Sequence, residues 1–201
     1  DVPLAKASEY GYYSKMLNVI RSMMSTSFKT NRFLQFAVVT GCLRIAKESI
    51  FTGANNFKSN SIAGSHYLDS FGFTEKEVVQ MLEDTGLLTH FSDVKRWYDG
   101  YHFGKCDIYC PWDVSNYVSD VLYEPDKAPG NYWKDTSHNN IIRQFVGKDG
   151  MDINDKLERL LAGGSIRSRI TEDSTYHLEN AAKEDFFSIL YFTGYLTIDR
   201  D

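Results

Sequence analysis

The spacing of apolar residues predicts a helix-rich α/β chain. Between Tyr12 and Lys29 apolar side chains recur every three or four positions, the period of an amphipathic helix. Phe33 to Val39 (FLQFAVV) is instead a short aromatic and β-branched run, which predicts a buried strand. Val2, which precedes Pro3, is expected to be extended. A strand, a helix and a second strand would begin a βαβ unit.

Caps, glycines and prolines divide the rest of the chain into predicted elements. The first are a helix from the Thr74 capping box to about Glu83, a helix over 92–98 ended by an Asp99-Gly100 turn, a strand over 106–109 and a helix over 111–121 begun by Pro111. A loop over 123–137 follows, and then helices over about 138–146 and 153–162. The last are a strand over 165–170, a helix over 181–192 capped by Gly194, and a strand over 195–198.

Polar residues follow the predicted strand at 33–39, where open α/β sheets place their sites. Thr40 and Gly41 close the strand, Arg44 lies just beyond it, and Asn55-Asn56 follow. A Thr or Asn in such a place can orient a water near a γ-phosphate, and an Arg can stabilise the charge that develops there. A helix cap with surface charge explains the same residues, so both interpretations stay open.

Composition limits the classes of function. The net charge of −5 disfavours a general nucleic-acid coat, although a local basic patch stays open. No apolar run reaches the roughly 18 residues of a membrane span, and no signal peptide opens the chain. The odd cysteine count (Cys42, Cys106 and Cys110) indicates free thiols in the reducing cytoplasm. Cys106 and Cys110 with His102 make an incomplete zinc set, so we expect packing thiols and no metal site.

Several catalytic motifs are absent from the 201 residues. Neither the phosphate-binding G-x-x-x-x-G-K-[ST] loop nor G-x-G-x-x-G occurs, and no G-x-S-x-G elbow is present. A metal-dependent nuclease is disfavoured because Asp93-Val94-Lys95 lies in a predicted helix and precedes Asp126. The aromatic turn at 97–101 (WYDGY) would either form a recognition surface or pack against Trp112 and Trp133.

Six sequence blocks, in order, carry a family resemblance. They are TGCLRIAKESIFTGANNF (40–57), FGFTEKEV (71–78), RWYDGYHFG (96–104), IYCPWDVSNYV (108–118), NYWKDTSHNN (131–140) and LYFTGYLTI (190–198). Through them the chain resembles the bacterial AAA-ATPase-like family, whose members are predicted P-loop ATPases that are often fused to a nuclease-like domain of the PD-(D/E)XK superfamily.

The resemblance implies that the chain is the C-terminal half of an ATPase domain. Asp1 matches the last acid of the Walker B run, and Thr40 lies in a sensor-like place. Asp1, Thr40 and Arg44 would then have catalytic roles, while Thr40, Gly41, Asn55 and Asn56 would contact the nucleotide. ATP and Mg²⁺ would bind the full-length protein, whose Walker A loop lies upstream of Asp1. The chain alone is expected to bind no cofactor and to be inactive.

The expected organisation has two parts. Residues 1–70 would complete a P-loop core, and residues 71–201 would form a helical lid with a winged-helix-like end at about 152–198. Loss of the upstream strands would expose the run at 33–39, so we expect either self-association or a rearranged sheet. The alternative is a protein- or DNA-interaction module without catalysis at 152–198, where Arg159, Arg167 and Arg169 supply positive charge.

Overall fold

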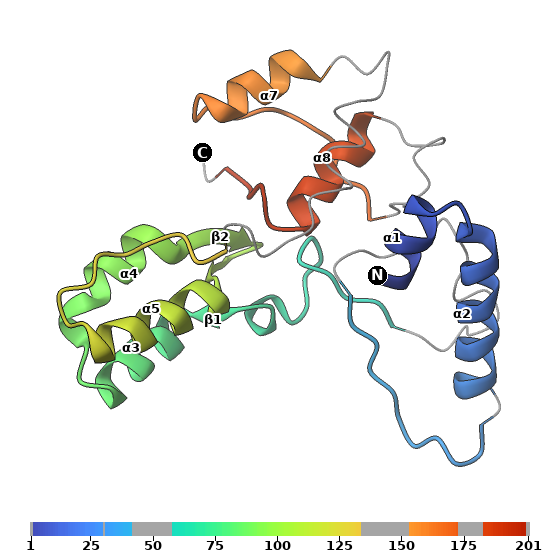
Figure 1. The fold of residues 1–201 in the computed structure, drawn as a ribbon, viewed down its shortest axis with the longest axis horizontal. Coiled ribbons are helices and arrows are strands. Elements are labelled where there is room, and N and C mark those ends of the chain that lie inside the picture. The colour runs from blue at the N-terminus through green and yellow to red at the C-terminus, as the bar shows by residue number, and fades with distance from the viewer. Residues whose placement is uncertain (1, 30, 42–57, 134–152, 173–182, 200–201) are drawn as a thin grey trace. The chain divides into compact units, whose positions relative to one another are not determined.

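The computed structural model describes residues 2–29, 31–41, 58–133, 153–172 and 183–199 (Figure 1). In these residues the fold is mixed α/β and rich in helix, with seven α-helices and one three-stranded antiparallel sheet. The chain divides into two compact units. Unit 1 comprises residues 1–59 and 139–196, and unit 2 comprises residues 60–138 and 197–201. The assignment of 1–70 to an ATPase core stays a prediction.

Unit 1 is helical in its described part. Its helices are α1 (Val2–Glu9), α2 (Tyr13–Phe28), α7 (Asn154–Leu161) and α8 (Lys183–Phe192). The predictions for α2, α7 and α8 are confirmed, and Gly194 adopts the left-handed φ of +83° expected after a helix. Residues 186–191 of α8 are all buried, together with Leu4, Tyr13, Leu17 and Ile153. Both segments of unit 1, 1–59 and 139–196, therefore contribute side chains to one core.

The extended start predicted for Val2 and Pro3 is wrong, because both residues belong to α1. Pro3 lies in the first turn, where its missing N–H has no intrahelical partner to lose. The helix also places Leu4, which is only 2% exposed, in the core of unit 1. Burial of this side chain therefore outweighs the local preference of the residue before a proline.

The buried strand predicted at 33–39 is also wrong. The segment forms no strand, and Phe33, Phe36 and Val38 are 88%, 77% and 75% exposed. A strand is stable only beside another strand, and the described residues of unit 1 contain none. The strands predicted at 165–170 and 195–198 are also wrong, because both segments lie outside any strand, so the described part of 152–198 lacks the strands of a winged helix.

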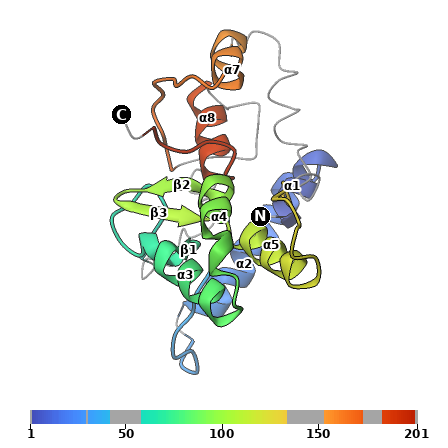
Figure 2. The same ribbon diagram turned by 90° about the vertical axis from the view of Figure 1, so that its left-hand side faces the viewer.

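Unit 2 holds the sheet (Figure 2). Its strands are β1 (Phe73–Thr74), β2 (Asp99–Phe103) and β3 (Cys106–Tyr109), and β3 is central. Its helices are α3 (Glu75–Asp84), α4 (Phe91–Tyr98) and α5 (Pro111–Tyr123), with two short 3₁₀ turns, η1 (Leu68–Ser70) and η2 (Leu88–His90). All three helices and β3 confirm the predictions.

Local signals explain these elements well. The Thr74 hydroxyl accepts from the Glu77 amide while the Glu77 carboxylate accepts from the Thr74 amide, which is the predicted capping box. Pro111 begins α5 as predicted. The predicted Asp99-Gly100 turn is wrong: α4 ends at Tyr98, but the chain continues directly into β2, and the pairing with β3 shifts register between Asp99 and Tyr101.

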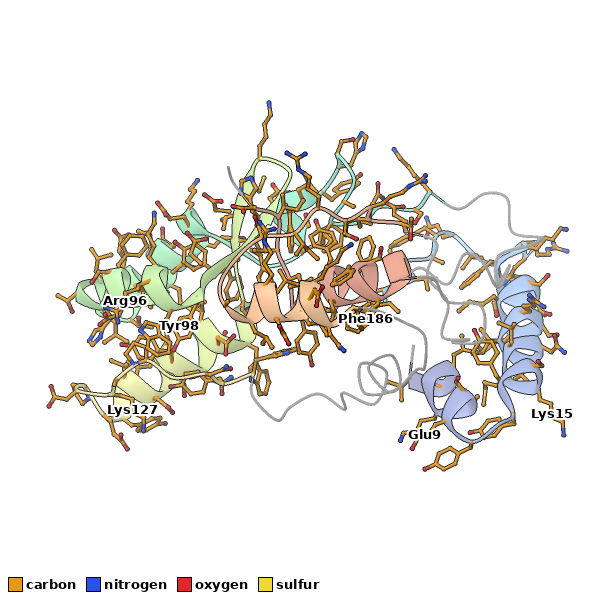
Figure 3. The ribbon with its side chains drawn as sticks, turned by 90° about the horizontal axis from the view of Figure 1, so that it is seen from above. Glu9, Lys15, Arg96, Tyr98, Lys127 and Phe186 are labelled. Atoms are coloured by element: carbon orange, nitrogen blue, oxygen red, sulfur yellow. The ribbon has the colours of Figure 1, made fainter. Side chains whose placement is uncertain are left out.

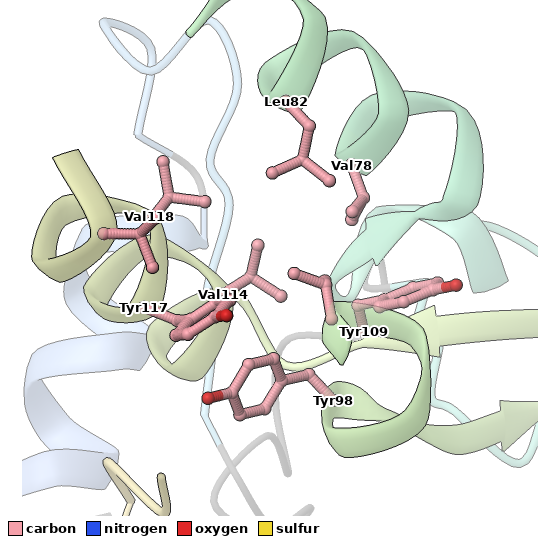
Figure 4. Close-up of a cluster of buried hydrophobic side chains, with 9 residues drawn as sticks. Val78, Leu82, Tyr98, Tyr109, Val114, Tyr117 and Val118 are labelled. Atoms are coloured by element: carbon pink, nitrogen blue, oxygen red, sulfur yellow. The ribbon is translucent and has the colours of Figure 1, made fainter. Parts of the chain in front are cut away.

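Unit 2 has its own hydrophobic core (Figure 4). Val78 and Leu82 of α3, Tyr98 of α4 and Tyr109 of β3 face the buried side of α5. The α5 contribution is Val114, Tyr117, Val118 and Val121. None of the described helices is both long and apolar enough to cross a membrane.

Candidate functional site

The structure describes only two of the residues that the sequence assigned to a nucleotide site. Thr40 and Gly41 are exposed and lie outside any helix or strand, so Thr40 does not end a strand as predicted. Asp1, Arg44, Asn55 and Asn56 lie outside the described residues. The grouping of these six residues into one site stays a prediction.

Thr40 and Gly41 lie in a stretch with a distinct charge pattern, which was not recognised from the sequence. Between Glu9 and Glu48 the chain has six basic residues and no acidic residue. Residues 60–138, in contrast, carry thirteen acidic and six basic residues. The net charge of −5 hides this contrast, and counting charges segment by segment would have found it. An anion near Thr40 would meet no carboxylate from this stretch.

The most developed polar arrangement lies in unit 2, where α4 and α5 hold the loop at 124–133, which we call the strap. The Tyr98 hydroxyl donates to the Gly130 carbonyl oxygen at 3.0 Å and accepts from the Gly130 amide at 3.1 Å. One carboxylate oxygen of Asp113 accepts from the amides of Tyr132 and Trp133, both at 3.0 Å. Side chains of the two helices thus satisfy backbone groups of Gly130, Tyr132 and Trp133 in the strap.

Further bonds fix the strap along α5. The Trp112 indole N–H donates to the Tyr132 carbonyl oxygen at 3.0 Å, and the Tyr132 hydroxyl donates to the Asp120 carboxylate at 2.7 Å. Tyr98 and Lys127 mark α4 and the strap in Figure 3. The ring of Tyr98 lies 5.6 Å from that of Tyr117 and 6.5 Å from that of Tyr132, centre to centre. In the aromatic segment at 97–101, which forms the end of α4 and the start of β2, Tyr98 packs against these rings while Trp97 stays 47% exposed.

Burial sets the protonation of these hydroxyls. It raises the pKa of Tyr98 to about 12 and also raises the pKa of Tyr132, Tyr117 and Tyr109. The hydroxyls therefore stay protonated at neutral pH and serve as hydrogen-bond donors. Through these hydrogen bonds the side chains of α4 and α5 hold the strap in place.

A second polar group lies on the sheet beside α3. Glu75 accepts from the Lys95 ammonium and from the Tyr109 hydroxyl. The hydrogen bond from Lys95 is the main cause that lowers the pKa of Glu75, and the same bond raises the pKa of Lys95. Both side chains are half-exposed, so this pair is a surface ion pair that connects α3, α4 and β3.

Two residues of the incomplete zinc set, His102 and Cys110, have the following environments in the structure. His102 shares a 2.7 Å hydrogen bond between its Nδ1 and the Asp107 carboxylate, and its backbone amide donates to the Thr197 hydroxyl. Cys110 precedes α5, and burial raises the pKa of its thiol to about 11. Among the described residues no group of three His, Cys, Asp or Glu could hold a metal ion.

Comparison with known proteins identifies a distant relative. No family model matches the chain, and no solved structure matches it. An uncharacterized protein from the 5′ region of vnfD in Azotobacter chroococcum mcd 1 is 22% identical over 181 residues. The match covers 90% of this chain and 32% of the relative, so the chain spans about a third of that protein's length.

Proposed function

We propose that the chain is part of the ATPase domain of a bacterial AAA-ATPase-like protein. The parent protein would bind ATP with Mg²⁺ and hydrolyse it, with the P-loop sheet and the Walker A loop supplied by upstream residues. This chain would follow Walker B and contribute the lid, and it would be inactive alone. The match occupies only 32% of the relative's length, which supports a parent protein longer than this chain.

The observation that carries this proposal is the meeting of three resemblance blocks in one core. The blocks at 71–78, 96–104 and 108–118 are separate in sequence, but they supply Val78, Tyr98 and Tyr109 to the same buried cluster of unit 2 (Figure 4). The blocks lie in one folded module, as the resemblance to a lid domain requires.

The proposed nucleotide contacts follow from the resemblance. Asp1 would complete the acidic Mg²⁺-binding run, Thr40 would orient the attacking water, and Arg44 would stabilise the γ-phosphate. Gly41 and Asn55-Asn56 would contact the nucleotide. The exposure of Thr40 and Gly41, within a stretch that lacks acidic residues, supports this assignment because a triphosphate needs an accessible and non-acidic site.

Two free cysteines in the described part, Cys106 and Cys110, support a reducing compartment, and we assign the parent to the cytoplasm. A DNA-binding module without catalysis at 152–198 has less support. Arg167 and Arg169 are exposed, but the strands that would complete a winged helix are absent from the described residues.

Calorimetry with ATP and Mg²⁺ tests the proposal on two proteins, the full-length parent and the 201-residue chain. We expect the parent to bind and the chain alone to give no heat of binding. The Thr40→Ala parent should bind ATP but hydrolyse it more slowly by about 10²-fold or more, as for removal of other groups that stabilise a transition state. A parent with no affinity for ATP contradicts the proposal.

A further inference from the structure

We propose that unit 1 carries a binding surface for single-stranded nucleic acid. The surface consists of Lys15 on α2 and of Lys29, Arg32, Phe33 and Phe36 after it, and we call it the basic–aromatic surface. This inference goes beyond the ATPase proposal and does not depend on it, because it concerns binding without ATP.

Charge is the first argument. Lys15, Lys29 and Arg32 are exposed, and they lie in the stretch between Glu9 and Glu48 that contains no acidic residue. Figure 3 shows Lys15 on α2. Lys15 lies in the first turn of α2 and Lys29 directly follows the helix, about 21 Å further along at the rise of a helix. Cations at this spacing, in a stretch without carboxylates, can contact separate phosphates of a strand several nucleotides long.

Exposed aromatic rings are the second argument. Phe33 and Phe36 are 88% and 77% exposed, and the Arg32 guanidinium lies 5.5 Å from the centre of the Phe33 ring. Bases of a single strand stack on such rings irrespective of sequence, while neighbouring cations hold the phosphates. The bases of a duplex are already stacked on each other. The rings therefore favour single strands over duplexes.

The turn that presents Phe33 is fixed by hydrogen bonds. The Asn31 side-chain oxygen accepts from the Phe33 amide at 3.1 Å, and the Asn31 side-chain nitrogen donates to the Ser27 carbonyl oxygen at 3.0 Å. The Lys29 amide donates to the Ser25 carbonyl oxygen at 2.9 Å. Two of the carbonyl groups at the end of α2, which would otherwise repel an anion, are thereby occupied.

Fluorescence anisotropy with the 201-residue chain and a labelled oligothymidylate tests the proposal. We expect binding that weakens as salt rises, with a slope of log affinity on log salt of about −2 for three phosphate contacts. Arg32→Ala should reduce the slope by about 0.7, and Phe33→Ala and Phe36→Ala should each weaken binding by about fivefold or more. Because the side chains are exposed, the variants should keep the circular dichroism of the wild type.

Matched controls are Arg96→Ala and Phe71→Ala, which remove an exposed cation and an exposed ring of unit 2, and they should bind like the wild type. A duplex of the same length should bind more weakly. Absent or salt-insensitive binding overturns the proposal. So does equal loss in the control variants, equal affinity for the duplex, or binding to anionic phosphatidylserine vesicles with none to the oligothymidylate.

Discussion

The Tyr98 hydroxyl makes two hydrogen bonds to one residue, donating to the carbonyl oxygen of Gly130 and accepting from its amide. Tyr98 is 4% exposed, and its ring packs in the core of unit 2. A single side chain thus connects the core to the backbone of the strap, 32 residues further along the chain. These two hydrogen bonds hold the strap against the core, although the strap itself contains no helix or strand.

Replacement of Tyr98 by Phe should destabilise unit 2. The change keeps the ring but leaves the amide and the carbonyl of Gly130 without this partner, at a cost of about 1–3 kcal/mol. Urea unfolding measured by circular dichroism gives the difference in unfolding free energy. Tyr123→Phe is the matched control, because Tyr123 is 86% exposed and should change stability little. Equal effects of both changes would contradict the assigned role of Tyr98.

Gly72 should not tolerate a side chain. A Cβ there would overlap the Ile108 side chain and lie 2.9 Å from the Tyr109 carbonyl oxygen, in the central strand. We expect Gly72→Ala to lower the unfolding free energy by about 1–3 kcal/mol through overpacking. Gly100→Ala provides the comparison, since nothing lies within 4 Å of the Cβ that it would add. If the two variants have the same unfolding free energy, the sheet accommodates the added Cβ without loss of stability and the prediction is wrong.

The helix boundaries that depend on neighbouring residues were predicted best from the sequence. The Thr74–Glu77 capping box and Pro111 at the start of α5 each fix a helix boundary within one turn, so neighbouring residues suffice to find them. The amphipathic period of α2 works similarly, because its buried side chains, such as Tyr13 and Leu17, recur on one face.

Long-range pairing was not predictable from local pattern. The run at 33–39 has the composition of a strand, yet a strand also needs a neighbour, which the pattern cannot supply. Asp99-Gly100 has the composition of a turn, but pairing with Tyr109 makes it the start of β2. The contacts of the strap with Tyr98 and Asp113 escaped for the same reason, since their partners lie 19 to 32 residues away. The charge contrast between 10–47 and 60–138 was visible in sequence but missed.

Unit 2 should lose stability at alkaline pH. Burial raises the pKa of Tyr98 to about 12, above its value of about 10 in the unfolded chain. Below about pH 10 both states are protonated and the stability is complete; as pH rises from about 10 to about 12, ionisation favours the unfolded chain. Urea unfolding at about pH 9 and about pH 11 measures the loss. Tyr98→Phe should reduce this pH dependence, and an unchanged dependence in that variant would contradict the assigned cause.

The isolated chain should associate with itself through the segment at 33–39. Phe33, Phe36 and Val38 are exposed, and this apolar segment contains no charge to prevent pairing with another copy. Sedimentation velocity at increasing concentration should show association, which Phe36→Lys should reduce because it introduces repulsion between copies. Added salt should leave this apolar association in place, whereas it should weaken nucleic-acid binding at the same surface. A monomer at every concentration would contradict the expectation, and association abolished by salt would indicate charge as its cause.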